Sequence, residues 1–398
     1  MSAKSSADFK KKPLAKAVAP EDVDLQGELD IVEYYGPQEL RWAQVAARNG
    51  AINALEEGFR TILIVMPTGC GKTITIACTL DSPEMRKALK VEGRPLRVLF
   101  LAHVQRLLTQ AERTFMEAFN VDMKVSTPFV EIDQKDLDWA DIIAIDEAHH
   151  ESMMSIQLQL DKMKHKPILG LTATPDRADG MVIKFEKIIE PVSREQAVKE
   201  GWLAETSIWS FIDTSGRDKT DIICRILDKY HTTMGKTMIF VKTRAEVAKI
   251  NTYLIHTLKL KSVALINQSN KELNTILDQY SKGEYQFIVN CAKIGEGVDV
   301  AGCVTVLLGR QLGSYPLLNQ YIGRCSRPDS DSQVFELINP LSGRNLDTTV
   351  VVGTPKAHYL CSPANDGNFT QRQFNYVSSV PTTELANGAQ AKRFNRAA

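Results

Sequence analysis

The sequence predicts an α/β protein built from two doubly wound parallel sheets in tandem. Short apolar runs rich in β-branched residues alternate with helical stretches from about residue 34 onward. Strands that are apolar along their whole length are buried on both faces, as in a parallel sheet covered by helices. The alternation occurs in two series, one on each side of residue 204, and so predicts two such sheets. The first series consists of TILIV (61–65), RVLFLA (97–102), DIIAI (141–145) and PILGLTA (167–173). The second consists of TMIFV (237–241), SVALI (262–266), QFIVN (286–290), VTVLL (304–308) and QVFELI (333–338).

The segments outside these two series differ in composition. The start of the chain is rich in Lys, Ala, Ser and Pro without an apolar period, so a flexible and weakly basic tail is expected. Between the series, SREQAVKEGWLAE (193–205) has Ser193 as a helix start and Gly201 as a helix stop, which places the domain boundary near Ala204. The end of the chain turns to Asn, Gly, Gln, Pro and Ser. The expected segments are a flexible basic tail (1–33), a first domain (34–204), a second domain (205–354) and a loosely ordered C-terminal tail (355–398).

Composition and charge limit the function. The chain is 43% hydrophobic and 24% charged, which is ordinary for a globular protein. It has no run of about 18 apolar residues and no apolar signal segment, so we expect no membrane partner and a cytoplasmic location, with organelle import as the alternative. Seven cysteines without a C-x-x-C pair argue against a disulfide framework and a zinc knuckle. Lys plus Arg equals Asp plus Glu at 48 each, so nucleic acid would have to bind through a local basic groove.

A glycine-rich loop follows the first predicted strand. Backbone amides of such a loop, with the N-terminus of the next helix, cradle phosphates. Lys72 would reach the outer phosphates, and the Thr73 hydroxyl would bind Mg²⁺. Met66 replaces the usual first glycine of the Walker A pattern, and an ordinary turn remains the alternative. The residues of the expected phosphate loop are Pro67, Thr68, Gly69, Cys70, Gly71, Lys72 and Thr73.

Two carboxylates follow the third strand of the first series. Asp146 and Glu147 at a helix start would favour the helix dipole and nothing more. At the end of a parallel strand they instead share an edge with the phosphate loop, since the carboxyl ends of the strands lie together. Asp146 would then hold Mg²⁺ through water, and Glu147 would orient and activate the attacking water. His149 and His150 lack further partners at zinc spacing and are expected to form hydrogen bonds only.

Near the end of the second series, LLNQYIGRCSRP predicts a helix that Pro328 ends. Gln320, Arg324 and Arg327 lie at i, i+4 and i+7, in one polar stripe, and no acidic residue occurs in this stretch. Cations in a last turn offset the negative end of the helix dipole, by about 0.3–1 kcal/mol. The alternative is that the arginines bind an anion supplied from elsewhere in the chain.

The segments PTGCGKT, IDEAHH, LTATP, GEGVD and QYIGRCSRP, in this order, resemble motifs I, II, III, V and VI of superfamily 2 helicases and translocases. The resemblance covers about residues 34–339. Its DEAHH form and its bridging segment look most like the DNA-acting branch, with RecG-like, UvsW-like and type III restriction translocase members. It implies two RecA-like domains, ATP and Mg²⁺ as cofactors, and nucleic acid as partner, with DNA favoured, in a prokaryotic or phage-infected cell.

The resemblance also implies roles for further residues. In LRWAQ, Gln44 would read adenine, for which one amide can both donate and accept; a surface glutamine is the alternative. In GEGVD, Gly297 and Asp299 resemble the ribose and phosphate sensor of the second domain. Arg324 and Arg327 would offset charge on the γ-phosphate, and Gln320 would sense the nucleotide or its water. Cys291 stands where relatives commonly carry Thr. Other candidate contacts are Tyr34 or Tyr35 for the base, Thr172 and Thr174 between the sites, and His103, Arg106, Lys242 and Arg244 for the nucleic acid.

The sequence therefore predicts an ATP-driven DNA helicase or translocase that moves on, unwinds or remodels nucleic acid. An RNA helicase and an ATP-switched binding or annealing motor subunit need the same motor and remain open. A GTPase is disfavoured because NKEL (270–273) lacks the Asp of the guanine-reading N-K-x-D motif. A small-molecule kinase would not explain a second domain with paired arginines.

Overall fold

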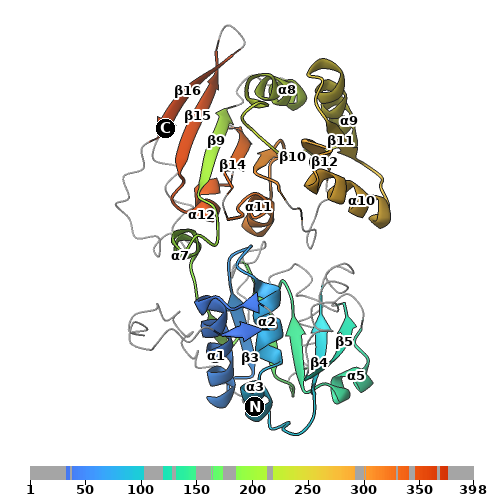
Figure 1. Cartoon of the computed structure of the whole chain (residues 1–398), viewed down its shortest axis with the longest axis vertical. Helices are drawn as coiled ribbons and strands as arrows, with labels where there is room; N and C mark the ends of the chain where they lie inside the picture. The colour runs from blue at the N-terminus through green and yellow to red at the C-terminus, as the bar shows by residue number, and fades with distance from the viewer. Residues whose placement is uncertain are drawn as a thin grey trace, which may run out of the picture. The chain divides into compact units, whose positions relative to one another are not determined.

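The computed structural model describes residues 33–35, 38–102, 120–127, 131–148, 163, 165–173, 185–212, 218–291, 300, 302–328, 330–339, 346–364 and 368–374. The chain divides into two compact units, residues 1–40 and residues 41–398, and each is described by itself. In the first unit, β1 (Tyr34–Tyr35) pairs antiparallel with β2 (Gln38–Glu39). Both sheets of the fold lie in the second unit (Figure 1). Within the described ranges no helix has the length and apolar character needed to cross a bilayer.

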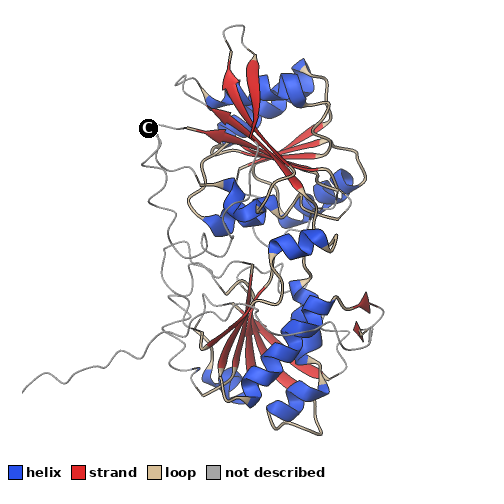
Figure 2. Ribbon diagram, turned by 90° about the vertical axis from the view of Figure 1, so that its left-hand side faces the viewer, coloured by secondary structure: helices blue, strands red, loops and turns tan. Residues whose placement is uncertain are grey.

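The first sheet has six parallel strands in the order β5-β4-β6-β7-β3-β8. Figure 2 shows them side by side with a progressive twist. The four inner strands are buried almost throughout, because their sequences are apolar along their whole length. Their bounds are β3 (Thr61–Val65), β4 (Leu96–Leu101), β5 (Val121–Ser126), β6 (Ile142–Ile145), β7 (Ile168–Thr172) and β8 (Lys187–Ile189).

Helix α1 lies close against the first sheet. Its buried positions Ala43, Ala47, Ala51 and Ala54 recur at helical spacing, and their small side chains allow the close approach. It packs on α2, α3, β3 and β8. The helices of this half and of the connecting segment are α1 (Trp42–Glu56), α2 (Lys72–Leu80), α3 (Pro83–Ala88), α5 (Gln134–Trp139) and α7 (Arg194–Lys199).

The second sheet has eight strands in the order β11-β12-β10-β13-β14-β9-β15-β16, parallel except for the β15–β16 pair. Alternate residues feed two cores, one on each face: Met238 and Phe240 enter one cluster and Ile239 the other. The strands are β9 (Thr206–Ile212), β10 (Thr237–Phe240), β11 (Ser262–Leu265), β12 (Phe287–Asn290), β13 (Thr305–Leu308), β14 (Ser332–Ile338), β15 (Ala357–Pro363) and β16 (Phe369–Phe374). The helices are α8 (Lys219–Tyr230), α9 (Arg244–Thr252) with a π-helical turn (Tyr253–Thr257), α10 (Asn270–Ser281), α11 (Tyr315–Ile322) and α12 (Thr348–Val352).

The predicted fold class, two doubly wound and mainly parallel sheets, is confirmed. The expectation of a loosely ordered tail from residue 355 is wrong for β15 (Ala357–Pro363) and β16 (Phe369–Phe374), the two strands at the edge of the second sheet. These strands mix polar and apolar residues because only part of each is buried, so an all-apolar pattern does not find them. Residues 365–367 and 375–398 of that tail, and residues 1–32 of the predicted basic tail (1–33), lie outside the described residues.

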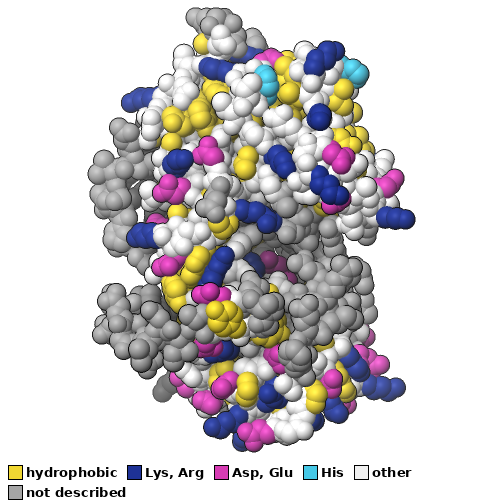
Figure 3. Space-filling model, in the orientation of Figure 1, with side chains coloured by type: hydrophobic (Ala, Val, Ile, Leu, Met, Phe, Trp, Pro, Cys, Tyr) yellow, Lys and Arg dark blue, Asp and Glu magenta, His cyan; other side chains and the backbone are white. Residues whose placement is uncertain are grey.

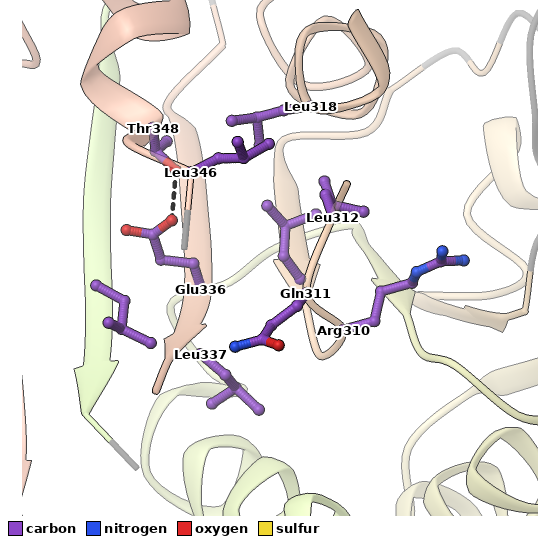
Figure 4. A pocket seen from close by; sticks show the side chains of 10 residues that line it. Arg310, Gln311, Leu312, Leu318, Glu336, Leu337, Leu346 and Thr348 are labelled. Atoms are coloured by element: carbon purple, nitrogen blue, oxygen red, sulfur yellow. Dashed lines mark hydrogen bonds between the residues drawn. The ribbon is translucent and has the colours of Figure 1, made fainter. Parts of the chain in front are cut away.

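The half-buried carboxylate of Glu336 ties α12 to the second sheet. Ser210 on β9 donates a hydrogen bond to Glu336 Oε1 at 2.6 Å. The Thr348 hydroxyl donates to the other oxygen, as Figure 4 shows. Burial raises the pKa of Glu336, although the two hydroxyl donors oppose this shift. The first residue of α12 is therefore fixed to β14 through one side chain.

Candidate nucleotide-binding site

The phosphate loop and the two carboxylates flank one strand of the first sheet. β7 lies between β3 and β6. Met66 at the end of β3 donates its amide to Thr172 O at 3.0 Å, and Ala148, which follows the carboxylates, donates to Leu171 O at 2.8 Å. Both segments thus leave the sheet at the same edge, as the parallel topology predicts.

The conformation of the phosphate loop depends on two glycines. Gly69 and Gly71 have φ values of 94° and 85°, in the left-handed region that favours glycine. A Cβ atom on Gly71 would lie 2.5 Å from Gln44 Nε2, and one on Gly69 would lie 2.7 Å from Leu203 Cδ2. Helix α2 begins directly after Gly71 with no side-chain cap among the described residues, so its first amides face the loop.

Met66, the departure from the Walker A pattern, lies in the core. Its side chain is fully buried, and Thr75 Oγ1 lies 3.5 Å from its sulfur. The side chain therefore packs under α2 and leaves the loop between residues 67 and 71 unobstructed. Methionine can therefore replace the usual glycine at residue 66, while Gly69 and Gly71 keep the left-handed backbone of the loop.

Lys72 and Glu147 meet at this edge. Lys72 Nζ lies 3.3 Å from Glu147 Oε1, and the two side chains are only 13% and 16% exposed. Glu147 has a φ of 48°, an uncommon conformation for a non-glycine residue, and its amide donates to Asp146 Oδ1 at 3.0 Å. The structure thus brings together three of the predicted catalytic residues from two separate strands.

Gln44 is buried beside the loop, so the surface-glutamine alternative is wrong. It is 2% exposed. Both ends of the buried amide are satisfied: Oε1 accepts from the Arg41 amide at 2.9 Å, and Nε2 donates to Gly71 O at 3.3 Å. Its amide is bonded to the loop at Gly71, the residue directly before α2. Its role in reading adenine stays a prediction, and Tyr34 and Tyr35 belong to the other unit of the chain.

The predicted helix through Arg327 is wrong, because α11 ends at Ile322. The Ser326 hydroxyl donates to Ile322 O at 3.1 Å and Cys325 Sγ donates to the same oxygen at 3.2 Å. These side chains compete for the carbonyl that a continuing helix would bond to the amide of residue 326. Arg324 and Arg327 are therefore in the irregular segment 323–328, the arginine turn, and the interpretation as last-turn cations of the helix does not apply.

The arginine turn lies against the phosphate loop. A Cβ atom on Gly323 would lie 2.5 Å from Thr68 Cγ2 and 2.8 Å from Thr68 Cβ, so only a glycine allows this approach. Asn319 on α11 donates to Ala173 O, after β7, at 3.4 Å. Gln320 is 8% exposed and therefore buried on the same helix. The long-range contact expected between the arginine motif and the first domain is thus made through Gly323.

Arg41 and Trp202, which have no role in the sequence-based prediction, border the loop as well. The Arg41 guanidinium lies 5.1 Å from the centre of the Trp202 ring, and its Nη1 donates to Gly69 O at 3.4 Å. The ring centres of Trp42 and Trp202 are 5.5 Å apart. Burial raises the pKa of the Cys70 thiol, and nearby cations including Arg41 oppose the shift. The sequence SREQAVKEGWLAE indicates a domain boundary. The contacts of Trp202 with Arg41 and Trp42 could not be predicted from it, because they form only in the folded chain.

The structure describes only some of the remaining predicted residues. Lys242 and Arg244 are exposed at the start of α9, and Cys291 Sγ donates to Lys242 O at 2.9 Å, so these segments meet at the carboxyl edge of the second sheet. Thr172 is fully buried at the end of β7. The predicted residues outside the described part of the chain are His103, Arg106, His149, His150, Thr174, Gly297 and Asp299.

The described residues fit a magnesium nucleotide. The Thr68 hydroxyl is buried and has no hydrogen-bond partner among the described residues, and α2 begins beside it with no side-chain cap on its first amides. Thr73 and Asp146 supply hydroxyl and carboxylate oxygens, which are the ligands that Mg²⁺ prefers. Lys72 adds a positive charge beside them.

Two family models match separate parts of this chain. Residues 38–137 match the family described as type III restriction enzyme, res subunit, and residues 218–329 match the helicase conserved C-terminal domain. The Saccharomyces cerevisiae protein named "Putative ATP-dependent helicase IRC3" is 23% identical over 346 residues, which are 74% of this chain and 50% of the relative. The Escherichia coli protein named "Type I restriction enzyme EcoAI endonuclease subunit" is 25% identical over 388 residues, 76% of this chain and 46% of the relative.

The chain thus spans about half the length of these curated relatives. Among solved structures, "The fragment structure of a putative HsdR subunit of a type I restriction enzyme from Vibrio vulnificus YJ016" matches with a TM-score of 0.64 and 21% identity, covering 83% of this chain and 70% of that one. This likeness shows the fold. The two family matches, one in each half of the chain, show that it carries a pair of domains like those of superfamily 2 helicases and translocases, with a tandem RecA-like fold.

Proposed function

We propose that this protein hydrolyses ATP to move along nucleic acid, with DNA preferred, as a helicase or translocase. The single observation that supports this most is the approach of Gly323 to Thr68, since it places the start of the arginine turn against the phosphate loop. Each of these segments is incomplete for hydrolysis. Together with Asp146 and Glu147, which follow β6, they supply phosphate-binding amides, a lysine, two carboxylates and two arginines.

The residues of the site would have separate roles in hydrolysis. The amides of Gly69 to Thr73 and the Lys72 ammonium hold the outer phosphates of ATP. Thr73 and Asp146 hold Mg²⁺, which neutralises charge on the β- and γ-phosphates when it is bound. Glu147 accepts the proton of the attacking water, and its contact with Lys72 keeps its carboxylate directed at the phosphates.

The arginine turn supplies the rate enhancement. Arg324 and Arg327 offset the charge that develops on the γ-phosphoryl group, an effect worth about 10³–10⁵ in rate. Both side chains are half-buried, in surroundings where a charge–charge interaction is stronger than at an exposed surface. Loss of the γ-phosphate after hydrolysis removes the anion that attracts the turn. Repeated attraction and release on a bound strand would give directional stepping.

The nucleic acid would be held through its phosphates. Lys242 and Arg244 are exposed at the carboxyl edge of the second sheet, next to Cys291. On the face drawn in Figure 3, basic and acidic side chains are interspersed, which agrees with the zero net charge. A small set of local phosphate contacts therefore suits this protein better than a large basic surface. The similarity to restriction enzyme subunits supports DNA as the strand.

The test is the rate of ATP hydrolysis with and without single-stranded DNA, duplex DNA, forked DNA and RNA at equal nucleotide concentration. We expect stimulation by DNA, and removal of Lys242 or Arg244 should lower the salt dependence of binding by about one ion each. Lys271→Ala, which changes an exposed lysine on α10, is the matched control. Absence of stimulation by any strand would refute the motor. Stronger stimulation by RNA would refute the DNA preference, and strand-displacement assays separate unwinding from annealing.

A further inference from the structure

The segment between the two sheets contacts both halves of the proposed site. This segment, residues 193–204, is called the linker below; it contains α7 and is followed by β9. At its end, Leu203 packs so closely on the phosphate loop that a Cβ atom on Gly69 would lie 2.7 Å from it. Trp202 lies under the Arg41 guanidinium beside the same loop. One side of the linker is therefore fixed to the phosphate loop.

The other contacts of the linker are made with the arginine turn. Arg194 Nη2 donates to Ser326 Oγ at 2.8 Å, and the Ala204 amide donates to Ser326 O at 3.4 Å. Ser326 is 1% exposed and lies in sequence between Arg324 and Arg327. Both its hydroxyl and its carbonyl are thus held by the linker, and a shift of the linker would move both arginines.

Arg194 contacts the end of α12 as well as the arginine turn. Its Nε donates to Val352 O, at the end of α12, at 3.3 Å, and its Nη1 is buried with no hydrogen-bond partner among the described residues. It is close enough to the phosphate loop to oppose the burial-induced rise in the pKa of Cys70. A planar guanidinium holds two acceptors in a fixed relation, which the ammonium group of lysine does not.

We propose that Arg194 is a positioning residue for ATP hydrolysis. It fixes Ser326, and through it the arginine turn, at the distance from the phosphate loop that the reaction requires. It acts through Ser326 and makes no contact with the nucleotide itself. This inference rests on the proposed function, since it assigns a role to a residue outside the recognised motifs in the same reaction.

The test compares Arg194→Met, Arg194→Lys, Ser326→Ala and the Arg194→Met/Ser326→Ala double variant in the full chain. Each removes or weakens the contact at 2.8 Å. We expect kcat to fall about 10²-fold, since a misplacement of about 1 Å has an effect of that size, while the Kd for ATP changes less than about twofold. The double variant should be no slower than the slower single variant, because both residues act through one contact. Lys199→Met, an exposed cation at the other end of α7, is the matched control and should leave kcat unchanged.

Three results would overturn the inference: wild-type kcat in Arg194→Met, a loss of ATP affinity in proportion to the loss of rate, or multiplying effects in the double variant. Circular dichroism and the melting temperature establish that each variant is folded. If Arg194→Met does not fold, Ser326→Ala and Arg194→Lys decide the question on the same criteria. If wild-type protein is not stimulated by nucleic acid, the proposed function fails, whereas the role of Arg194 is still judged on unstimulated hydrolysis.

Discussion

Gly323→Ala tests the contact on which the proposed site depends. Gly323 has φ and ψ of −57° and −17°, which alanine adopts without strain, so the backbone itself should gain about 0.4–1 kcal/mol of stability from the change. The new methyl group, however, would lie 2.5 Å from Thr68 Cγ2 and 2.8 Å from Thr68 Cβ. Carbon atoms pack at about 3.5–4.0 Å, so the arginine turn and the phosphate loop must separate by about 1 Å.

A separation of this size is expected to lower kcat for ATP hydrolysis about 10²-fold, because the arginines no longer reach the γ-phosphate correctly. The melting temperature should be unchanged or higher. Gly313→Ala is the matched control, since a Cβ atom there meets no atom within 4 Å. Adding Thr68→Ser to Gly323→Ala removes the nearest clashing atom and should restore part of the rate. A Gly323→Ala protein that hydrolyses ATP within twofold of wild type would refute the contact.

Three further predictions concern the site and the second core. Lys72→Ala should weaken both ATP binding and hydrolysis, whereas Arg327→Ala should leave the Kd for ATP nearly unchanged and lower kcat by about 10³-fold or more. Glu147→Gln keeps the shape of the side chain but cannot accept a proton, so kcat should fall by about 10²–10⁴-fold while ATP still binds, as measured by calorimetry and steady-state kinetics. Glu336→Gln should remove a pH dependence of stability. The folded state holds the Glu336 proton to higher pH than the unfolded chain does, so the wild-type free energy of unfolding should fall as the pH rises above the ordinary Glu range, and the variant should lack this decline in urea titrations.

Each of these predictions has an outcome that contradicts it. Normal hydrolysis by Arg327→Ala would show that the arginine turn does not act on the phosphate. A Glu147→Gln protein that has lost ATP binding would indicate a structural carboxylate held by Lys72 instead of a base. The free energy of unfolding of Glu336→Gln and of the exposed control Glu284→Gln should depend on pH differently. If both depend on pH in the same way, the pKa of Glu336 is not raised in the folded state.

The sequence was sufficient for the inner strands of the first sheet, whereas β9, an inner strand of the second sheet, was not predicted. Strands β3, β6 and β7 were predicted because a strand buried on both faces has little freedom in composition, and their parallel arrangement places the phosphate loop beside Asp146 and Glu147. Edge strands such as β5 and β16 escaped prediction because water on one side permits polar residues. The conformation after Ile322 also escaped it, since helical spacing fits Gln320 to Arg327 equally well until the Ser326 hydroxyl competes for the helix carbonyl.

By itself, the sequence determined the fold class and the position of the glycine-rich loop after β3, because those depend on local composition and strand order. The tertiary structure alone decided that the arginine turn lies against that loop. Gly323 and Thr68 are far apart in the chain, and nothing local in either segment encodes their contact. The same holds for Arg194 and Ser326, whose hydrogen bond arises only when the connecting segment packs on both halves of the site.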